Sequence, residues 1–178
     1  MVEPPTTIGN SILANFFRQN EWANLKLIDA CATLDPALLD TVEQGAERSL
    51  RTTLWRIIEA ERRMAAVLNG DEATILAPLA RTPDGALTTL RVFAIETGEA
   101  LAAWAEGVAG DPMLSGEWDG EPYRAPASIL AGQALLLSME QRTRVQDALR
   151  RAGIDPPDLT AWAWWEAISE GGAESPTI

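Results

Sequence analysis

Apolar residues recur every three or four positions in four long stretches of this chain, and that spacing places them on one face of an α-helix. The first helix is expected to begin at Asn10 or Ser11, two residue types that cap helices, and to end before Asp35. The second helix is expected over residues 47–68, and Gly70 supplies its stop signal. Helices are therefore the predicted elements of the N-terminal half.

The second and third helices are separated by residues 70–84, a connection longer than the about two to eight residues usual between bundle helices. Thr82 followed by Pro83 is typical of a cap and first helical turn, so the third helix is expected to begin there. This helix should end at Gly110. Residues 109–125 are punctuated by glycine, proline and aspartate, and this composition predicts a loop.

The fourth helix is expected to begin near Pro126 or Ser128 and to end at Gly153 in a left-handed cap. A short terminal helix is predicted over residues 159–168, after two consecutive prolines. It should bring three tryptophans over the other helices, where core packing is the favoured interpretation of aromatic residues at helical spacing. These residues are Trp162, Trp164 and Trp165.

The pattern as a whole predicts an all-α fold in one domain spanning residues 1–178, because a chain of this length can bury a single core. Residues 1–9 and 171–178 are expected to be flexible. No linker divides the helical stretches. The single cysteine, Cys31, rules out an intrachain disulfide and is interpreted as a small buried apolar residue rather than a nucleophile.

The net charge of −12 disfavours nucleic acid and anionic membrane surfaces as partners, because both carry negative charge. No apolar run approaches the roughly 20 residues that a membrane-spanning helix needs. The N-terminal residues have no cationic region ahead of an apolar one, so no signal peptide is expected. Together these features favour a cytoplasmic protein.

Several polar residues interrupt the apolar stripes. Asn20 and Asn24 lie on or beside the stripe of the first helix, and bonding to a neighbouring backbone is the favoured interpretation over ligand contact. Glu61 falls inside the second stripe, so it needs a cationic partner or a solvent-facing position. With Glu59 and Glu140 it is a carboxylate available for chemistry, but solvated faces and ion pairs are the favoured interpretation of all three.

Four segments resemble, in the right order, motifs of the DinB-like four-helix-bundle family. They are QNEWAN at 19–24, SLRTTLWRIIEAE at 49–61, LAGQALLLSMEQRTRV at 130–145 and RRAGIDPPDLTAWAWW at 150–165. The resemblance covers about residues 16–165, with Gln19 standing where the family usually has an aromatic residue. It implies a DinB-like four-helix bundle with a long crossover connection and a short C-terminal helix.

Members of this family typically carry three metal-binding histidines, and two of them lie four residues apart on the fourth helix. The resemblance places Arg56, Leu137 and Gln141 at the three histidine positions, and the chain has no histidine. Leucine cannot ligate a metal and arginine would repel one. We therefore expect that the metal site is lost, that there is no metal or other cofactor, and that metal-dependent activity is absent.

The resemblance leaves three functional hypotheses open. The first is a metal-less member of the family that binds a small molecule in the bundle pocket, with a biochemical role not specified by the sequence. The second is a metal-independent transferase related to thiol-dependent S-transferases. The third is a structural or interaction module that forms a homodimer.

Under the first hypothesis, the candidate pocket residues are Arg56, Leu137 and Gln141. A buried guanidinium requires an anion, because burying an isolated charge is strongly unfavourable. An internal carboxylate is the favoured partner of Arg56, and a small carboxylate ligand oriented by the Gln141 amide is the alternative. The internal candidates are Glu21, Asp29, Glu59 and Glu140.

Overall fold

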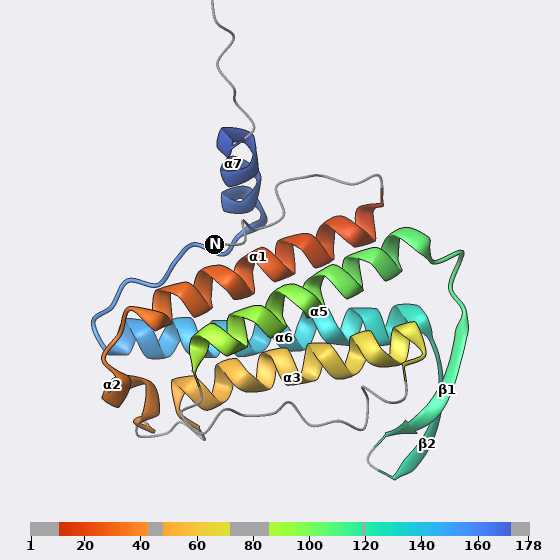
Figure 1. Ribbon diagram of the computed structural model, residues 1–178, viewed down its shortest axis with the longest axis horizontal. Coiled ribbons are helices and arrows are strands. Elements are labelled where there is room, and N and C mark those ends of the chain that lie inside the picture. The colour runs from red at the N-terminus through yellow and green to blue at the C-terminus, as the bar shows by residue number, and fades with distance from the viewer. Residues whose placement is uncertain (1–10, 43–47, 72–85, 119, 172–178) are drawn as a thin grey trace, which may run out of the picture.

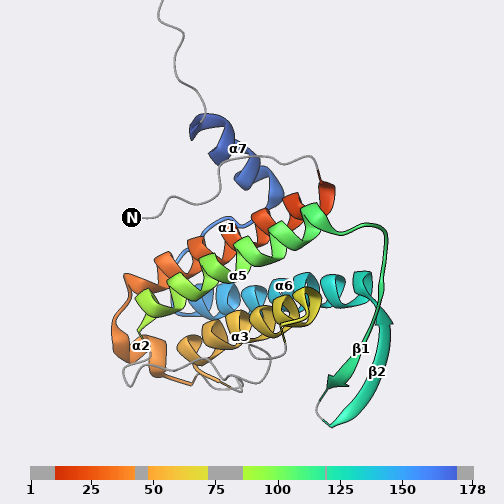
Figure 2. The same ribbon diagram turned by 45° about the vertical axis from the view of Figure 1, so that its right-hand side comes forward.

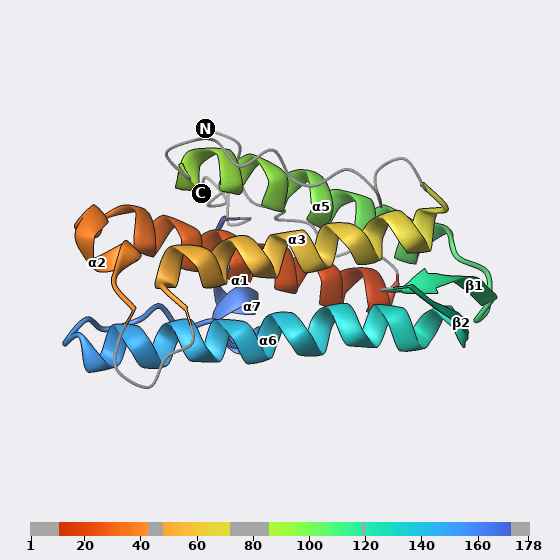
Figure 3. The same ribbon diagram turned by 90° about the horizontal axis from the view of Figure 1, so that it is seen from below.

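A computed structural model describes residues 11–42, 48–71, 86–118 and 120–171. Four long helices lie side by side along one direction (Figures 1 and 3). They are α1 (Ile12–Ala32), α3 (Leu50–Asn69), α5 (Leu87–Gly107) and α6 (Ala127–Arg151). Two shorter helices, α2 (Pro36–Asp40) and α7 (Ala161–Gly171), complete the helical elements of the described residues. The predicted helical fold class is confirmed.

The helix boundaries follow the capping residues of the sequence. Ser11 caps α1 by accepting a hydrogen bond from the amide of Ala14, as predicted. Asp35 caps α2 in the same way. The second long helix begins at Leu50 rather than at residue 47, because the side chain of Ser49 accepts from the backbone there. Several expectations lie outside the described residues. They concern residues 1–10, the helix start expected at residue 47, the 72–85 connection with Thr82 and Pro83, and residues 172–178.

The predicted loop at residues 109–125 is wrong in part, since most of it forms an antiparallel hairpin at one end of the long helices (Figure 2). Its strands are β1 (Met113–Trp118) and β2 (Glu121–Pro126). Gly120 has a φ of 87° in the turn, a backbone conformation that glycine adopts without steric cost. Tyr123 packs against the core, while most neighbouring strand residues are exposed on both faces. The strands therefore lack the alternating apolar pattern that would have revealed them.

The end of α6 is formed as the sequence predicts. Gly153 has a φ of 76°, and the amide of Ile154 donates to the carbonyl of Leu149 at 2.9 Å, which closes the helix with a left-handed cap. Helix α7 then stands away from the four long helices at a steep angle (Figures 1 and 2). Its packing corrects one expectation, because only one of its three tryptophans is buried. Trp164 is covered, whereas Trp162 is 77% exposed and Trp165 is also exposed.

The core is divided along its length. One apolar cluster fills the end of the long helices that includes Leu54, Leu90 and Leu149, and a second fills the end that includes Phe17 and Leu101. Buried polar residues lie between these two clusters on every long helix. We call this set the polar layer. Its members are Asn20, Glu21 and Asn24 of α1, Glu61 of α3, Thr97 of α5, and Ser138 and Arg142 of α6.

Within the described residues, every helix is too short or too polar to cross a membrane.

Candidate functional site

Glu61 is the centre of the polar layer and is only 1% exposed. Its Oε1 accepts hydrogen bonds from Asn20 Nδ2 at 2.7 Å and from the hydroxyl of Ser138. Asn24 Nδ2 lies 2.9 Å from both carboxylate oxygens. Of the two environments expected for Glu61, a cationic partner or a solvent-facing position, the second is wrong, and so is the expectation that the asparagines bond to backbone. A buried carboxylate needs donors, and these side chains supply them.

Arg142 extends from α6 toward the other side of the same two asparagines. Its Nη1 donates to Asn20 Oδ1 and to Asn24 Oδ1, both at 2.7 Å. Each amide thus donates to Glu61 and accepts from Arg142, which fixes its orientation. Burial lowers the pKa of Arg142, and the nearby Glu61 carboxylate opposes that shift. The layer therefore links a buried carboxylate to a buried guanidinium, and the two neutral amides lie between them.

Helix periodicity explains how the layer is built. Asn20 and Asn24 are four residues apart on α1, and Ser138 and Arg142 are four residues apart on α6. Residues at this spacing lie on the same helix face, so each helix presents two polar groups to the same level of the core. Glu61 on α3 completes the set. A pair of polar residues four apart inside an apolar stripe was the available signal, and we recognised it on α1 but not on α6.

The residues predicted for the pocket lie elsewhere. Arg56 is exposed on α3, so its charge requires no buried anion. Leu137 is half-buried and lines a separate cavity of about 360 Å³, together with Met64 and Tyr123. Gln141 is half-buried. The residues of α6 that point into the core here are Ser138 and Arg142, each one position after a predicted pocket residue. The sequence pattern had placed them on the neighbouring face of the helix.

Three of the four carboxylates proposed as internal partners of Arg56 contact other residues. Asp29 accepts from Arg91 Nε at 2.9 Å, which joins α1 to α5. Glu140 pairs with Arg144 one turn along α6. Glu21 is 2% exposed and packs against Gly98 of α5, where an added Cβ would lie 2.4 Å from Glu21 Cγ.

The pKa of Glu21 is raised to about 8, first by burial and then by the negative charges of Glu99 and Glu61, while Arg18 lowers it. At pH 7 this carboxyl is therefore mainly protonated. Glu61, by contrast, accepts hydrogen bonds from Asn20, Asn24 and Ser138. The polar layer thus holds two glutamates in different environments.

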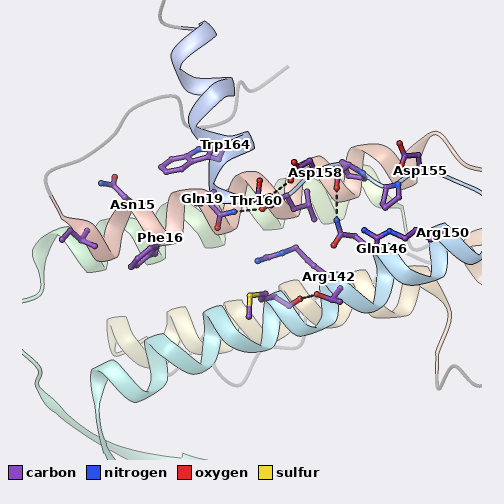
Figure 4. Close-up of a pocket in the computed structure, with 17 residues that line it drawn as sticks. Asn15, Phe16, Gln19, Arg142, Gln146, Arg150, Asp155, Asp158, Thr160 and Trp164 are labelled. Atoms are coloured by element: carbon purple, nitrogen blue, oxygen red, sulfur yellow. Dashed lines mark hydrogen bonds between the residues drawn. The ribbon is translucent and has the colours of Figure 1, made fainter.

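A groove of about 970 Å³ opens beside the polar layer, between α1, α6 and the chain that leads into α7 (Figure 4). Arg142 lines it, and so does Arg150 nearer the end of α6. Most of its other walls are apolar. The apolar lining comprises Ile12, Phe16, Met139, Pro156, Pro157, Leu159, Ala161 and Trp164.

Two glutamines fix the wall that faces Arg142. Gln19 Nε2 donates to the carbonyl of Leu159 at 2.9 Å, and Gln146 Nε2 donates to the carbonyl of Pro157 at 2.8 Å (Figure 4). Both bonds attach the proline-containing segment to the long helices, Gln19 from α1 and Gln146 from α6. Gln19 is therefore a structural tether of the groove.

Trp164, which lines the groove from α7, has an indole N–H that is itself inaccessible and has no partner. The indole is 8% exposed and packs with Trp22 and Ala23. Among the residues that the structure describes, its Nε1 is the one buried side-chain nitrogen or oxygen with no hydrogen-bond partner. Buried donors are normally paired, so this one needs an explanation.

The polar layer does not suit a metal ion. The asparagine oxygens of the layer face Arg142, and the guanidinium would repel a cation. In the described part of the chain, no group of three histidine, cysteine, aspartate or glutamate residues could hold a metal. Cys31 is fully buried in the core, and burial raises the pKa of its thiol to about 11, which disfavours the reactive thiolate.

Comparison with known proteins gives no family assignment. No protein-family model matches the sequence. A search of curated proteins also finds no significant match.

Proposed function

We propose that this protein is a DinB-like four-helix bundle without a metal site, and that it binds a small carboxylate in the groove beside Arg142. Four long helices, the N-x-W-A-N sequence of α1 and the pair of inward residues four apart on α6 support the family part of the proposal. In this register, Ser138 and Arg142 take the positions of the paired histidines, one residue after the positions that the sequence motifs suggested.

The observation that carries the proposal is the position of the Arg142 guanidinium. Arginine has N–H donors on Nε and on both terminal nitrogens. Nη1 is occupied by Asn20 and Asn24, whereas Nε and Nη2 remain on a side chain that lines the groove. This half of the guanidinium presents the parallel donors that bind a carboxylate in a bidentate manner.

The carboxylate of the polar layer is saturated by other donors, and of the two carboxylates that line the groove, Asp155 and Asp158, the second accepts from the amide of Thr160. Glu61 accepts from Asn20, Asn24 and Ser138, and it makes no direct hydrogen bond to Arg142 in the described structure. The apolar walls then suit the body of an organic acid, because most small-molecule sites combine apolar lining with few placed polar groups. A buried charged layer is not needed for stability, since apolar residues in the same place are often equally stable.

A thermal-shift screen tests the proposal. We expect hexanoate, phenylacetate or 3-phenylpropanoate to raise the melting temperature of the wild type, while the matching carboxamides do not. The amides keep the size and apolar body but lack the charge that Arg142 would bind. Equal shifts with acids and amides, or no shift with any acid at millimolar concentration, would remove the carboxylate from the proposal.

One observation favours the interaction-module hypothesis as a second candidate. Ile129, Leu136 and Met139 of α6 are all more than half exposed, and exposed apolar side chains on one helix suit a homodimer interface. Light scattering coupled to gel filtration would measure twice the chain mass of 19.3 kDa if the dimer forms. A mass of one chain throughout the micromolar range would exclude it.

A further inference from the structure

We propose that the ligand of the groove is an α-amino acid with an apolar side chain. Its carboxylate binds Arg142, and this inference therefore rests on the proposed carboxylate site and names its ligand class. Its ammonium group binds Asp158 and the side-chain oxygens of Gln19 and Gln146. Its apolar side chain lies at the other end of the groove, beside Phe16.

The free half of the Arg142 guanidinium is open to a ligand. Nε and Nη2 make no hydrogen bond within the described structure, since both bonds of this side chain use Nη1. Neither nitrogen is sealed in the core, because the one buried side-chain polar atom without a partner among the described residues is Trp164 Nε1. Arg142 is 7% exposed and lines the groove. A molecule in the groove can therefore reach this half of the guanidinium.

Two amide oxygens beside Arg142 are acceptors without a donor. Gln19 and Gln146 line the groove from α1 and α6, and both are half-buried. Each donates through Nε2 to a backbone carbonyl, at 2.9 Å and 2.8 Å, which fixes the orientation of its amide. Within the described structure neither Oε1 has a partner. An ammonium group carries three N–H donors and no acceptor, so it suits such a pair of oxygens.

Asp158 adds a negative charge between these two amides. It lies between Pro157 and Leu159, whose carbonyls accept from the two glutamines, and it lines the groove opposite α6 (Figure 4). Its carboxylate accepts from the amide of Thr160 at 2.9 Å, and hydrogen bonds from this amide and hydroxyl hold the pKa of Asp158 below its usual value. Asp158 is therefore charged at neutral pH, and in the described part of the chain it forms no ion pair. A ligand cation is its natural partner.

The order of groups along the groove sets the position of the ammonium on the ligand. Helices α1 and α6 run in the same direction, since their first halves share one apolar cluster and their second halves share the other. Phe16 and Met139 therefore lie on one side of Arg142, and Gln146 lies on the other (Figure 4). A ligand that meets all of these groups carries its ammonium beside the carboxylate and not at the far end of its apolar body. This is the arrangement of an α-amino acid.

Matched acids test this inference by titration calorimetry. Hexanoate is compared with 2-aminohexanoate and 6-aminohexanoate, and 3-phenylpropanoate is compared with phenylalanine, each 2-amino acid as both enantiomers. One enantiomer of each 2-amino acid should bind at least about tenfold more tightly than its parent, because its ammonium gains charge-assisted hydrogen bonds. 6-Aminohexanoate should bind more weakly than hexanoate, since its charge would lie at the apolar end.

A substitution in the facing wall identifies the acceptor. Asp158→Asn removes the charge but keeps an oxygen for the amide of Thr160. It should reduce the preference for 2-amino acids to less than about threefold and change the affinity for 3-phenylpropanoate by less than about threefold. The matched control is Asp155→Asn, which also alters an aspartate of the groove. Asp155 lies beyond the tethered Pro157, away from Arg142, so this variant should keep the wild-type preference.

The outcomes separate this inference from the site on which it rests. Equal affinity for parent and 2-amino acids, or a preference that survives Asp158→Asn, overturns this inference alone. Binding of 6-aminohexanoate as tightly as 2-aminohexanoate does the same. Failure of every acid to bind overturns the carboxylate site as well.

Discussion

Glu61 on α3 and Arg142 on α6 are joined through the side chains of Asn20 and Asn24, which donate to the carboxylate and accept from the guanidinium. The two opposite charges are thus separated by neutral amides in the middle of the helical core. Such an arrangement satisfies both buried groups while leaving part of the guanidinium for the groove. It also means that removing either charged side chain leaves the other buried without its counter-charge, which costs folding free energy.

The charge pair predicts a specific pattern in a double-mutant cycle. Glu61→Leu should lower the free energy of unfolding by about 3–5 kcal/mol, because Arg142 remains buried without its counter-charge. Adding Arg142→Met should recover much of that loss, since both charges are then absent. Urea denaturation measures all three variants.

The control for this cycle is Glu140→Gln on the exposed face of α6. Glu140 pairs with Arg144, but both side chains are more than half exposed, so the change should stay within about 0.5 kcal/mol. Additive losses from the two core substitutions would show that Glu61 and Arg142 are energetically independent.

A glycine pair tests the packing of Glu21 against α5. Gly98→Ala should destabilise the protein by about 1–3 kcal/mol, because the new Cβ would lie 2.4 Å from Glu21 Cγ in a closed contact. Gly132→Ala on α6 is the matched control. Nothing lies within 4 Å of its added Cβ, so it should stabilise by about 0.5–1 kcal/mol through helix propensity. Thermal unfolding that ranks the two variants in the opposite order would contradict this packing.

The protonation of Glu21 predicts a pH dependence of stability. Its pKa is raised from 4.5 to about 8 in the fold, so the folded state binds the proton more tightly than the unfolded state. The stabilisation is complete below about pH 4.5 and is lost as the pH rises through about 8, with a slope of at most about 1.4 kcal/mol per pH unit. Glu21→Gln should flatten the profile between pH 5 and 8 in urea denaturation. Parallel profiles for variant and wild type would show that Glu21 is ionised in the fold.

The polar layer also predicts the outcome of metal analysis. Purified protein, with any tag removed, should contain far less than one zinc or nickel ion per chain by elemental analysis. The reason is the buried guanidinium of Arg142, which would repel a cation in this layer. A metal content near one per chain that is lost on Glu61→Gln would contradict this account of the layer.

The sequence predicted the long helices because their apolar stripes and caps are local signals, as Ser11, Asp35 and Gly153 illustrate. The hairpin was missed because backbone pairing forms it and its side chains are mostly exposed. A helix cap can be recognised from a few neighbouring residues, whereas an exposed strand pair has no apolar alternation to reveal it. Capping motifs therefore predict helix ends more reliably than the sequence predicts this hairpin.

The site could be predicted only in part. Asn20 and Asn24 were recognised as polar residues in a buried stripe, but their partners come from α3 and α6, which no local pattern identifies. On α6, a shift of one residue turns a side chain by about 100° around the axis. That shift separates Leu137 and Gln141 from Ser138 and Arg142. The burial of Trp164 depends on the fold alone, since neighbouring Trp162 has the same chemistry and is exposed.

The central claim is that Arg142 binds a carboxylate from the groove, and calorimetric titration with 3-phenylpropanoate tests it most directly. The folded double variant Glu61→Leu/Arg142→Met should bind at least about 30-fold more weakly than the wild type. Arg150→Gln, which alters the other arginine of the groove, should change the affinity by less than about threefold, because Arg150 is exposed and pairs with Asp147. Undiminished binding by the double variant would contradict the claim.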